Sequence, residues 1–351
     1  MRLNSLVASF FLATVAVAAP SIPGIGIHYY GAFNSGYRAY TLSFDPAGNL
    51  YAGSDNNATD GEFMRRIPAG GGFWETISNE KIYDPDGVLF DVTGAFSGEP
   101  GTLLVASSDL VPFSGRIRAL RGNGTNFNAV GPLAALDNND AMAFDSAKNL
   151  YINVAGNRTI AKFKGISPQV VITLPVGGGV LAIDDSDRIW VACADGRIRR
   201  YGSDHVLQAT ITVSGNDPAL GYCAGGTFPK GIYTVNRSTG ALYRVTPSDT
   251  LVQVGTGFPN THALAFDAAG NLYCANYDTG EVLRSGCVAD LNADGFVDDA
   301  DFTIFIVAYN MLDCADPAMP ALCPADLNRD GLVEDSDFVI FVAAYNELIC
   351  P

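Results

Sequence analysis

The chain has 351 residues, 48% of them hydrophobic and 17% charged, a balance that allows a large buried core and excludes intrinsic disorder as its main state. Lys and Arg total 21 against 37 Asp and Glu, so the net charge is −16. Such an acidic chain repels phosphate backbones and anionic lipids, which argues against nucleic acid and membrane surfaces as partners.

Residues 1–18 are predicted to be a signal peptide. Arg2 precedes an apolar run of 13 residues that ends in Ala-Val-Ala, the small-x-small pattern of a signal peptidase site. The run is shorter than the roughly 20 residues that a membrane-spanning helix needs. We therefore expect a mature chain that starts at Ala19, has no membrane span, and is secreted, extracellular or attached to a cell surface.

Residues 19–286 contain an internal repeat. The segments at 44–51, 144–151 and 266–273 share a Phe-Asp pair followed by Asn-Leu-Tyr, and three looser copies lie between them. The apolar second strand of each unit recurs every 39 to 53 residues, which is the length of a four-stranded propeller blade. The anchors of these strands are Leu50, Leu103, Leu150, Ile189, Ile232 and Leu272. We predict an all-β six-bladed propeller, with five or seven blades as the alternatives.

The last blade lacks a fourth strand in the sequence. The chain passes from Arg284 directly into Gly286-Cys287, whereas an apolar run at 25–33 has no assignment at the other end of the mature chain. If that run supplies the missing strand, the ring closes and no sheet edge stays open.

The motif Phe-Asp-x-x-Gly-Asn-Leu-Tyr, at 44–51 and 266–273, resembles the NHL-type propeller repeat and its streptogramin lyase and gluconolactonase relatives. The resemblance covers about residues 25–286. It implies the propeller architecture, whereas activity does not follow from it because one fold hosts many functions.

An aspartate follows the first strand in five of the units. Chemistry at one site does not require a residue in every blade, whereas each turn needs a side chain that bonds its own backbone. We therefore interpret these carboxylates as turn residues and not as a ring of metal ligands. They are Asp45, Asp91, Asp145, Asp184 and Asp267.

Three histidines remain in the mature chain. His28 falls in the expected closing strand, His205 in a polar turn, and His262 in a loop that is expected to open onto the channel. A lone histidine is more often bonded to a backbone group than used as a ligand or base, so no catalytic residue is assigned. The resemblance nevertheless implies an axial histidine for lyases, which makes His262 the candidate of an alternative enzymatic function.

Residues 287–351 are strongly acidic, with 13 Asp or Glu against Arg329 alone, a net charge of −12. Residues 290–301 carry side-chain oxygens at loop positions 1, 3 and 5, glycine at 6 and a carboxylate at 12, which is the layout of a calcium loop, and residues 326–337 repeat it 36 residues later. We predict two calcium ions as cofactors. The predicted ligands are Asp290, Asn292, Asp294, the Phe296 carbonyl and Asp301, then Asp326, Asn328, Asp330, the Leu332 carbonyl and Asp337.

Each loop is followed by one apolar helix, at 302–310 and 338–346, and neither loop is preceded by one. This loop-helix pair resembles a dockerin, and Gly286-Cys287 with four cysteines resembles the Gly-Cys variant found at the C-termini of secreted bacterial proteins. The resemblance implies a cohesin-like partner or another surface scaffold protein, chosen through loop positions 10 and 11. About 65 residues with this charge have too little core to fold without a counter-ion.

The four cysteines of this acidic region are also related by the 36-residue shift. A bond from Cys287 to Cys314 would span a helix of roughly 12 residues, about 18 Å long, whereas a disulfide needs Cα atoms within about 7 Å. We predict Cys314 bonded to Cys323 and Cys287 bonded to Cys350. At most one pair can form among the remaining three, Cys193, Cys223 and Cys274.

Together these patterns predict a secreted, non-catalytic binding protein. Its propeller would recognise a glycan, a peptide or a protein, and its calcium-loaded dockerin-like region, a small all-α domain, would attach it to a scaffold. The alternative is a lyase or hydrolase linked to polysaccharide catabolism, or acting on a lactone, with its active site at the propeller channel.

Overall fold

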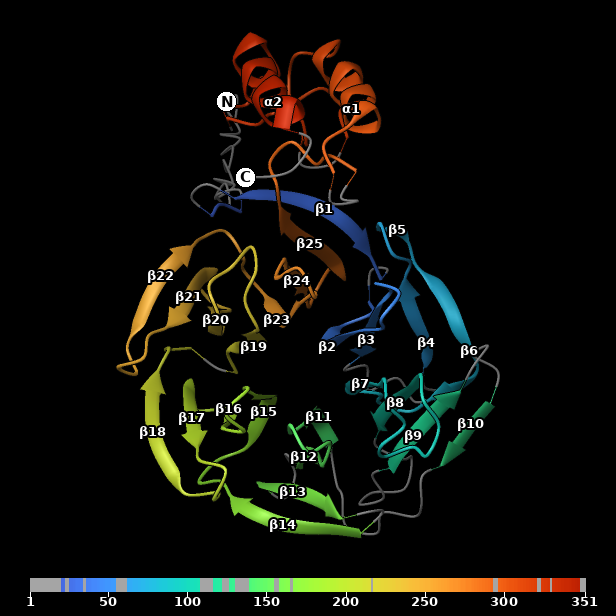
Figure 1. Cartoon of the computed structure of the whole chain (residues 1–351), viewed down its shortest axis with the longest axis vertical. Coiled ribbons are helices and arrows are strands. Elements are labelled where there is room, and N and C mark those ends of the chain that lie inside the picture. Colours follow the sequence, from blue (N-terminus) through green and yellow to red (C-terminus); the bar gives the residue numbers. More distant parts are fainter. Residues whose placement is uncertain are drawn as a thin grey trace, which may run out of the picture.

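The computed structural model describes residues 20–22, 25–33, 36–54, 62–107, 116–121, 126–129, 139–154, 158–164, 167–215, 217–292, 296–320, 323–328 and 330–347. The predicted signal peptide lies outside these residues. The described residues form six β-sheets around a central channel, and two helices lie beyond one edge of the ring (Figure 1). Six blades are therefore confirmed. In the described part of the chain, no helix has the length and apolar character to cross a membrane.

The first, innermost strands of the blades line the channel: β2 (Ala39–Phe44), β7 (Gly87–Asp91), β11 (Asn139–Phe144), β15 (Gly178–Ile183), β19 (Ala219–Cys223) and β23 (Thr261–Phe266). The second strands are β3 (Leu50–Ser54), β8 (Thr102–Ser107), β12 (Leu150–Val154), β16 (Ile189–Cys193), β20 (Gly231–Asn236) and β24 (Leu272–Asn276). The third strands are β4 (Glu62–Ile67), β9 (Arg116–Arg121), β13 (Thr159–Lys164), β17 (Arg197–Tyr201), β21 (Ala241–Val245) and β25 (Glu281–Gly286). The outer strands are β6 (Glu75–Ile82), β10 (Asn126–Ala129), β14 (Ser167–Thr173), β18 (Leu207–Thr212), β22 (Leu251–Gly255) and β1 (Gly26–Ala32).

Burial explains why the second strands gave the clearest repeat. Every residue of β3, β8, β12 and β16 is buried, because both faces of these strands pack against neighbouring blades. Strands buried on both faces are continuously apolar. The outer strand β18 is mostly exposed, with Ile211 as its buried residue, and such strands carry little sequence signal.

The N-terminal strand closes the ring as expected. β1 pairs antiparallel with β25, from Gly26 opposite Gly286 to Ala32 opposite Glu281, and it places His28 in the sheet. The short strand β5 (Gly72–Phe73) adds to the other edge of β1 in parallel. Ser21 exchanges backbone hydrogen bonds of 2.8 and 2.9 Å with Thr256, so the same segment also holds the fifth blade.

The recurring aspartates are turn residues, as predicted. Asp45 Oδ1 accepts hydrogen bonds from the backbone N–H groups of Ala47 and Asn49, each at 2.9 Å, while its Oδ2 accepts from Asn49 Nδ2 at 2.7 Å and from the Tyr51 hydroxyl at 2.9 Å. Asp267 repeats this arrangement. These carboxylates are saturated by their own turn, which explains why the motif spaces Asp, Asn and Tyr as it does.

The C-terminal region folds into α1 (Asp299–Tyr309) and α2 (Asp335–Glu347). Both helices begin three residues before the predicted starts because the end of each loop already belongs to the helix: Asp298 caps α1 and forms a capping box with Asp301. The rings of Phe305 and Phe341 lie 5.0 Å apart at the centre of the small core between the helices.

A disulfide joins Cys314 and Cys323, with Cα atoms 5.3 Å apart, as predicted. Cys287 is disulfide-bonded and therefore not paired with Cys314, while its predicted partner Cys350 lies outside the described residues. The other three cysteines are buried free thiols, so no bond forms among them; they are Cys193, Cys223 and Cys274. Burial raises the pKa of each of these thiols.

Candidate functional site

The side chains of the second predicted calcium loop bond backbone groups of the same loop. The Asp330 backbone N–H donates to Asp326 Oδ1 at 3.1 Å and to Asn328 Oδ1 at 2.9 Å. Asp337, at position 12, is fully buried, and its Oδ1 accepts from the backbone N–H groups of Leu327 at 2.7 Å and Asn328 at 2.9 Å. The side chains of Asp326, Asn328 and Asp337 thus bond backbone groups of their own loop.

The first loop is built in the same way around Asp301. Its Oδ1 accepts from the Asn292 backbone N–H and its Oδ2 from that of Asp298, each at 2.9 Å. Asp290 is 1% exposed and Asp301 is fully buried. Burial raises the pKa of Asp301, and the nearby charge of Asp290 raises it further, although the amide hydrogen bonds act in the opposite direction. Asp294 lies outside the described residues.

The donor chemistry of both loops fits calcium, which prefers carboxylate, amide and carbonyl oxygens. Arg329 is the sole basic residue of 287–351 in the sequence, and it lies outside the described residues. No ion pair joins Asp301 or Asp337 to a described residue. A buried carboxylate without a cationic partner is costly, so the loops suit a divalent ion that supplies the missing charge.

Two reciprocal contacts lock the helices to the opposite loops. The Tyr309 hydroxyl donates to Asp335 Oδ1 and the Tyr345 hydroxyl donates to Asp299 Oδ1, each at 2.5 Å. Asp299 and Asp335 both occupy loop position 10. The tyrosine of each helix therefore bonds the position-10 aspartate at the start of the other helix. The sequence pattern did not reveal this use of position 10, because Tyr309 lies 26 residues from Asp335 and Tyr345 lies 46 residues from Asp299.

The first loop is also joined to the propeller. Arg284 on β25 contacts Asp290 through Nη1 and Oδ2 at 3.2 Å, and both side chains are almost completely buried. His28 Nε2 lies 2.9 Å from the Cys287 carbonyl oxygen. The sequence analysis placed Arg284 only at the end of the last blade, and its contact with a predicted calcium ligand was not foreseen.

His262 is in strand β23 and not in a loop, contrary to the sequence-based expectation. The pairing of β23 with β24 starts already at Thr261, before a register shift, which extends the strand past the predicted turn. His262 is 3% exposed, its ring lies 4.0 Å from that of Tyr40, and its Nδ1 is 3.3 Å from the Tyr40 carbonyl oxygen. Burial, aided by the charge of Arg237, lowers the pKa of His262 to about 3.

Two guanidinium groups lie near His262. Arg38 and Arg237 both lie over the Tyr277 ring, 5.5 and 5.1 Å from its centre, and the His262 ring is 5.6 Å from that same ring. Among the described residues, no side chain is hydrogen-bonded to His262. The cluster contains cationic and aromatic side chains, and no described acid or nucleophile is hydrogen-bonded to the histidine.

The central channel is lined by both polar and apolar groups. A cavity of about 310 Å³ lies between the innermost strands. Side chains from different blades line it, among them Leu42, Val88, Met142, Leu181, Leu220 and Leu264.

No protein-family model and no curated protein matches the chain. Solved structures do share its fold. A putative gluconolactonase has a TM-score of 0.58 and 14% identity, covering 75% of this chain and 92% of that one. A luciferin-regenerating enzyme has a TM-score of 0.58 and 12% identity, covering 75% and 95%. An auxiliary nutrient binding protein from Bacteroides thetaiotaomicron has a TM-score of 0.55 and 11% identity, covering 72% and 69%.

Identities this low establish similarity of fold alone. The propeller is similar to binding proteins and to enzymes, so the comparison does not choose between the two classes. The chain thus shares the architecture of gluconolactonase-like six-bladed propellers.

Proposed function

We propose that the protein is a secreted, non-catalytic binding protein that is attached through its C-terminal region. The propeller binds a glycan, a peptide or a protein. The dockerin-like region, residues 287–351, loads two calcium ions and docks on a cohesin-like or other surface scaffold protein. One observation carries this proposal: two copies of an oxygen-rich loop close around the buried carboxylates Asp301 and Asp337, and no ion pair joins either of them to a described residue.

The residues divide into two equivalent sets of ligands. Asp290, Asn292, Asp294, Asp301 and the Phe296 carbonyl would hold the first ion, and Asp326, Asn328, Asp330, Asp337 and the Leu332 carbonyl the second. Calcium supplies two positive charges at each set, which offsets repulsion in a region of net charge −12. The backbone amides that already bind Asp301 and Asp337 orient both position-12 carboxylates toward the loop.

The outer faces of the helices offer the docking surface. Several apolar side chains remain exposed although the helices pack on each other, with Val339 at 67% and Val307 at 48%. Exposed apolar side chains that cluster on a small domain are typical of a protein interface. The others are Phe302, Ile306 and Phe338.

Calcium titration of the full chain by calorimetry tests the attachment proposal. We expect two sites per chain, and Asp337→Asn should abolish one of them because it removes the position-12 charge of the second loop. Asp316→Asn is the matched control, since it removes the same charge outside both loops. The absence of calcium binding to the folded protein, or equal loss in both variants, would overturn the proposal.

The competing proposal is a lyase or hydrolase acting on a polysaccharide or a lactone at the propeller channel. It is favoured by one arrangement, the neutral His262 stacked on Tyr40 beside the cationic Arg38 and Arg237. A base of low pKa with cations nearby suits proton abstraction from an anionic substrate only weakly. Turnover that is lost in His262→Ala, while the folded propeller is retained, would establish this alternative.

A further inference from the structure

A basic residue on the third strand faces an aromatic residue of the second strand in five blades. In four of them a carboxylate neutralises the basic side chain: Arg66 contacts Glu75 at 2.9 Å, Lys162 contacts Asp145 at 3.2 Å, Arg284 contacts Asp290 at 3.2 Å, and Arg200 contacts Asp249. The equivalent basic residue of the fifth blade is therefore expected to have a carboxylate partner as well. The facing pairs are Tyr51 and Arg66, Tyr151 and Lys162, Trp190 and Arg200, Tyr233 and Arg244, and Tyr273 and Arg284.

Arg244, in the fifth blade, departs from this expectation. The first strand of that blade is not followed by the aspartate that the other units carry, and backbone carbonyls take its place: Tyr233 donates to the Pro229 oxygen at 2.7 Å, and Arg244 Nη2 donates to the Lys230 oxygen at 3.0 Å. Arg244 Nε is buried without a hydrogen-bond partner. Among the described residues, no carboxylate pairs with Arg244.

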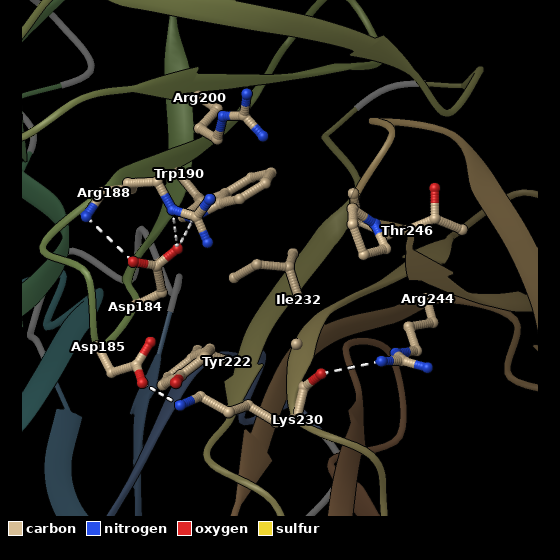
Figure 2. A pocket seen from close by; sticks show the side chains of 13 residues that line it. Asp184, Asp185, Arg188, Trp190, Arg200, Tyr222, Lys230, Ile232, Arg244 and Thr246 are labelled. Atoms are coloured by element: carbon tan, nitrogen blue, oxygen red, sulfur yellow. Dashed lines mark hydrogen bonds and ion pairs between the residues drawn. The ribbon is translucent and has the colours of Figure 1, made fainter.

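Arg244 lines a cavity of about 200 Å³ between the fourth and fifth blades, on the side of the ring where the first strands end (Figure 2). The other cations of this cavity are already paired. Arg188 contacts Asp184 at 2.7 Å and Lys230 contacts Asp185, while Arg200 contacts Asp249 just outside. The cavity therefore has one cation in excess, in a protein with a net charge of −16.

Gly231, the first residue of β20, lies beside the guanidinium group of Arg244. A Cβ atom at position 231 would lie 3.4 Å from Arg244 Nε, and the backbone there has a φ of +153°, which glycine adopts readily. Ile232, Val245 and Pro247 contribute apolar groups to the lining. Thr246 and Asp185 add a hydroxyl and a carboxylate (Figure 2).

We propose that this cavity binds one uronic acid unit of an acidic glycan. The sugar carboxylate would pair with Arg244, because a guanidinium group forms strong charge-assisted hydrogen bonds with a carboxylate. The C–H face of the ring would pack on the apolar groups of the lining, and Asp185 would accept from sugar hydroxyls. An acidic peptide offers the carboxylate but not the hydroxyl groups that Asp185 and Thr246 suit. This inference rests on the proposed glycan-binding role of the propeller.

Tryptophan fluorescence of the calcium-loaded full chain provides the test. The protein has two tryptophans, and Trp74→Phe leaves Trp190 in the cavity as the reporter. We expect digalacturonic acid to change this signal and the matched neutral digalactoside to bind at least about tenfold more weakly, since it lacks the charge-assisted pair. Arg244→Gln should weaken digalacturonate binding by about the same factor.

Arg66→Gln is the matched control, because Arg66 has the same repeat position and already has Glu75 as its partner. It should leave digalacturonate binding unchanged. Equal affinity for both sugars, no effect of Arg244→Gln in a folded protein, or preference for a glutamate-containing tripeptide would each overturn the inference. If digalacturonate does not bind while calcium fills two sites, the cavity assignment alone fails; if neither binds, the proposed function fails as well.

Discussion

Aspartate has different surroundings in the propeller and in the C-terminal region. In the propeller each turn aspartate is surrounded by its own donors; Asp184, for example, accepts from Arg188 Nε at 2.7 Å and from Trp190 Nε1 at 2.8 Å. Asp301 and Asp337 accept only backbone N–H groups among the described residues. The motif Asp-x-x-x-Asn thus marks a turn whose carboxylate is satisfied by its own side chains and backbone, whereas Asp301 and Asp337 have backbone donors but no cationic partner among the described residues.

Removing calcium should produce the largest difference in stability between the two regions. A site filled at about 1,000 times its Kd stabilises the folded form by about 4 kcal/mol, so chelation should melt α1 and α2 and leave the blades folded. Hydrogen exchange followed by mass spectrometry would locate the change. We expect faster exchange in 299–309 and 335–347 and no change in β12 or β16. Equal protection of the helices with and without chelator would contradict the comparison.

Arg284 is the residue that links the two regions. Removing one partner of a buried ion pair costs about 3–5 kcal/mol, so Arg284→Leu should strongly destabilise the protein by leaving Asp290 unpaired. We expect a smaller loss with calcium than with chelator, because the ion would compensate the charge of Asp290. Thermal unfolding in both conditions measures this difference. Arg66→Leu, which breaks an ion pair with 35% and 50% exposed side chains, should cost at most about 1 kcal/mol.

The disulfide adds a covalent restraint to the C-terminal region alone. Cys314 and Cys323 are 9 residues apart, and closing a loop of that size stabilises a fold by roughly 2–3 kcal/mol in the chain-entropy description. The double substitution Cys314→Ser, Cys323→Ser should therefore lower the stability of the helices and raise the calcium concentration needed to fold them. Denaturant unfolding at fixed calcium gives the value. A matching loss in propeller stability would show that the two regions are not independent.

His262 should give the propeller a pH dependence of its own. Its pKa is lowered to about 3 in the fold, against about 6.5 in an unfolded chain. The stability that this neutral histidine contributes is present above pH 6.5 and is lost as the pH falls toward 3, because the unfolded chain takes up the proton first. The loss is about 1.4 kcal/mol at pH 5.5.

The substitution His262→Gln should flatten this slope of unfolding free energy between pH 6.5 and 4. The imidazole C–H resonance of His262 should show no protonation above pH 4 in the folded protein. A resonance that titrates near pH 6.5 would mean that the ring is open to water, which would contradict the buried stack on Tyr40.

The repeat made most of the fold predictable from the sequence. The second strands are apolar throughout because both faces are buried, so their spacing counted the blades, and the absent fourth strand after Arg284 identified the closing role of β1. The predicted calcium ligands were found by loop spacing in the same way, and their metal binding remains a prediction. Features that depend on residues close together in the sequence, such as strand spacing and loop spacing, were therefore predictable from local patterns.

What the sequence did not reveal depends on contacts between distant residues. His262 was assigned to a loop because the register shift that lengthens β23 is set by its pairing with β24. The isolation of Arg244 becomes visible only when the partners of the equivalent residues are known, and one of these pairs, Arg200 with Asp249, joins two blades across 49 residues. A sequence window of the length of a typical blade does not contain both members of that pair.

The position of β25 has a mechanical consequence. Its hydrogen bonds run to β24 on one side and to β1 on the other, and the chain leaves its end directly into the C-terminal region. A pull on that region along the strand would load both ladders in shear, so that many bonds must break together. An anchored molecule built in this way would hold against flow, and a propeller circularly permuted to end in an outer strand would peel away one bond at a time under single-molecule force.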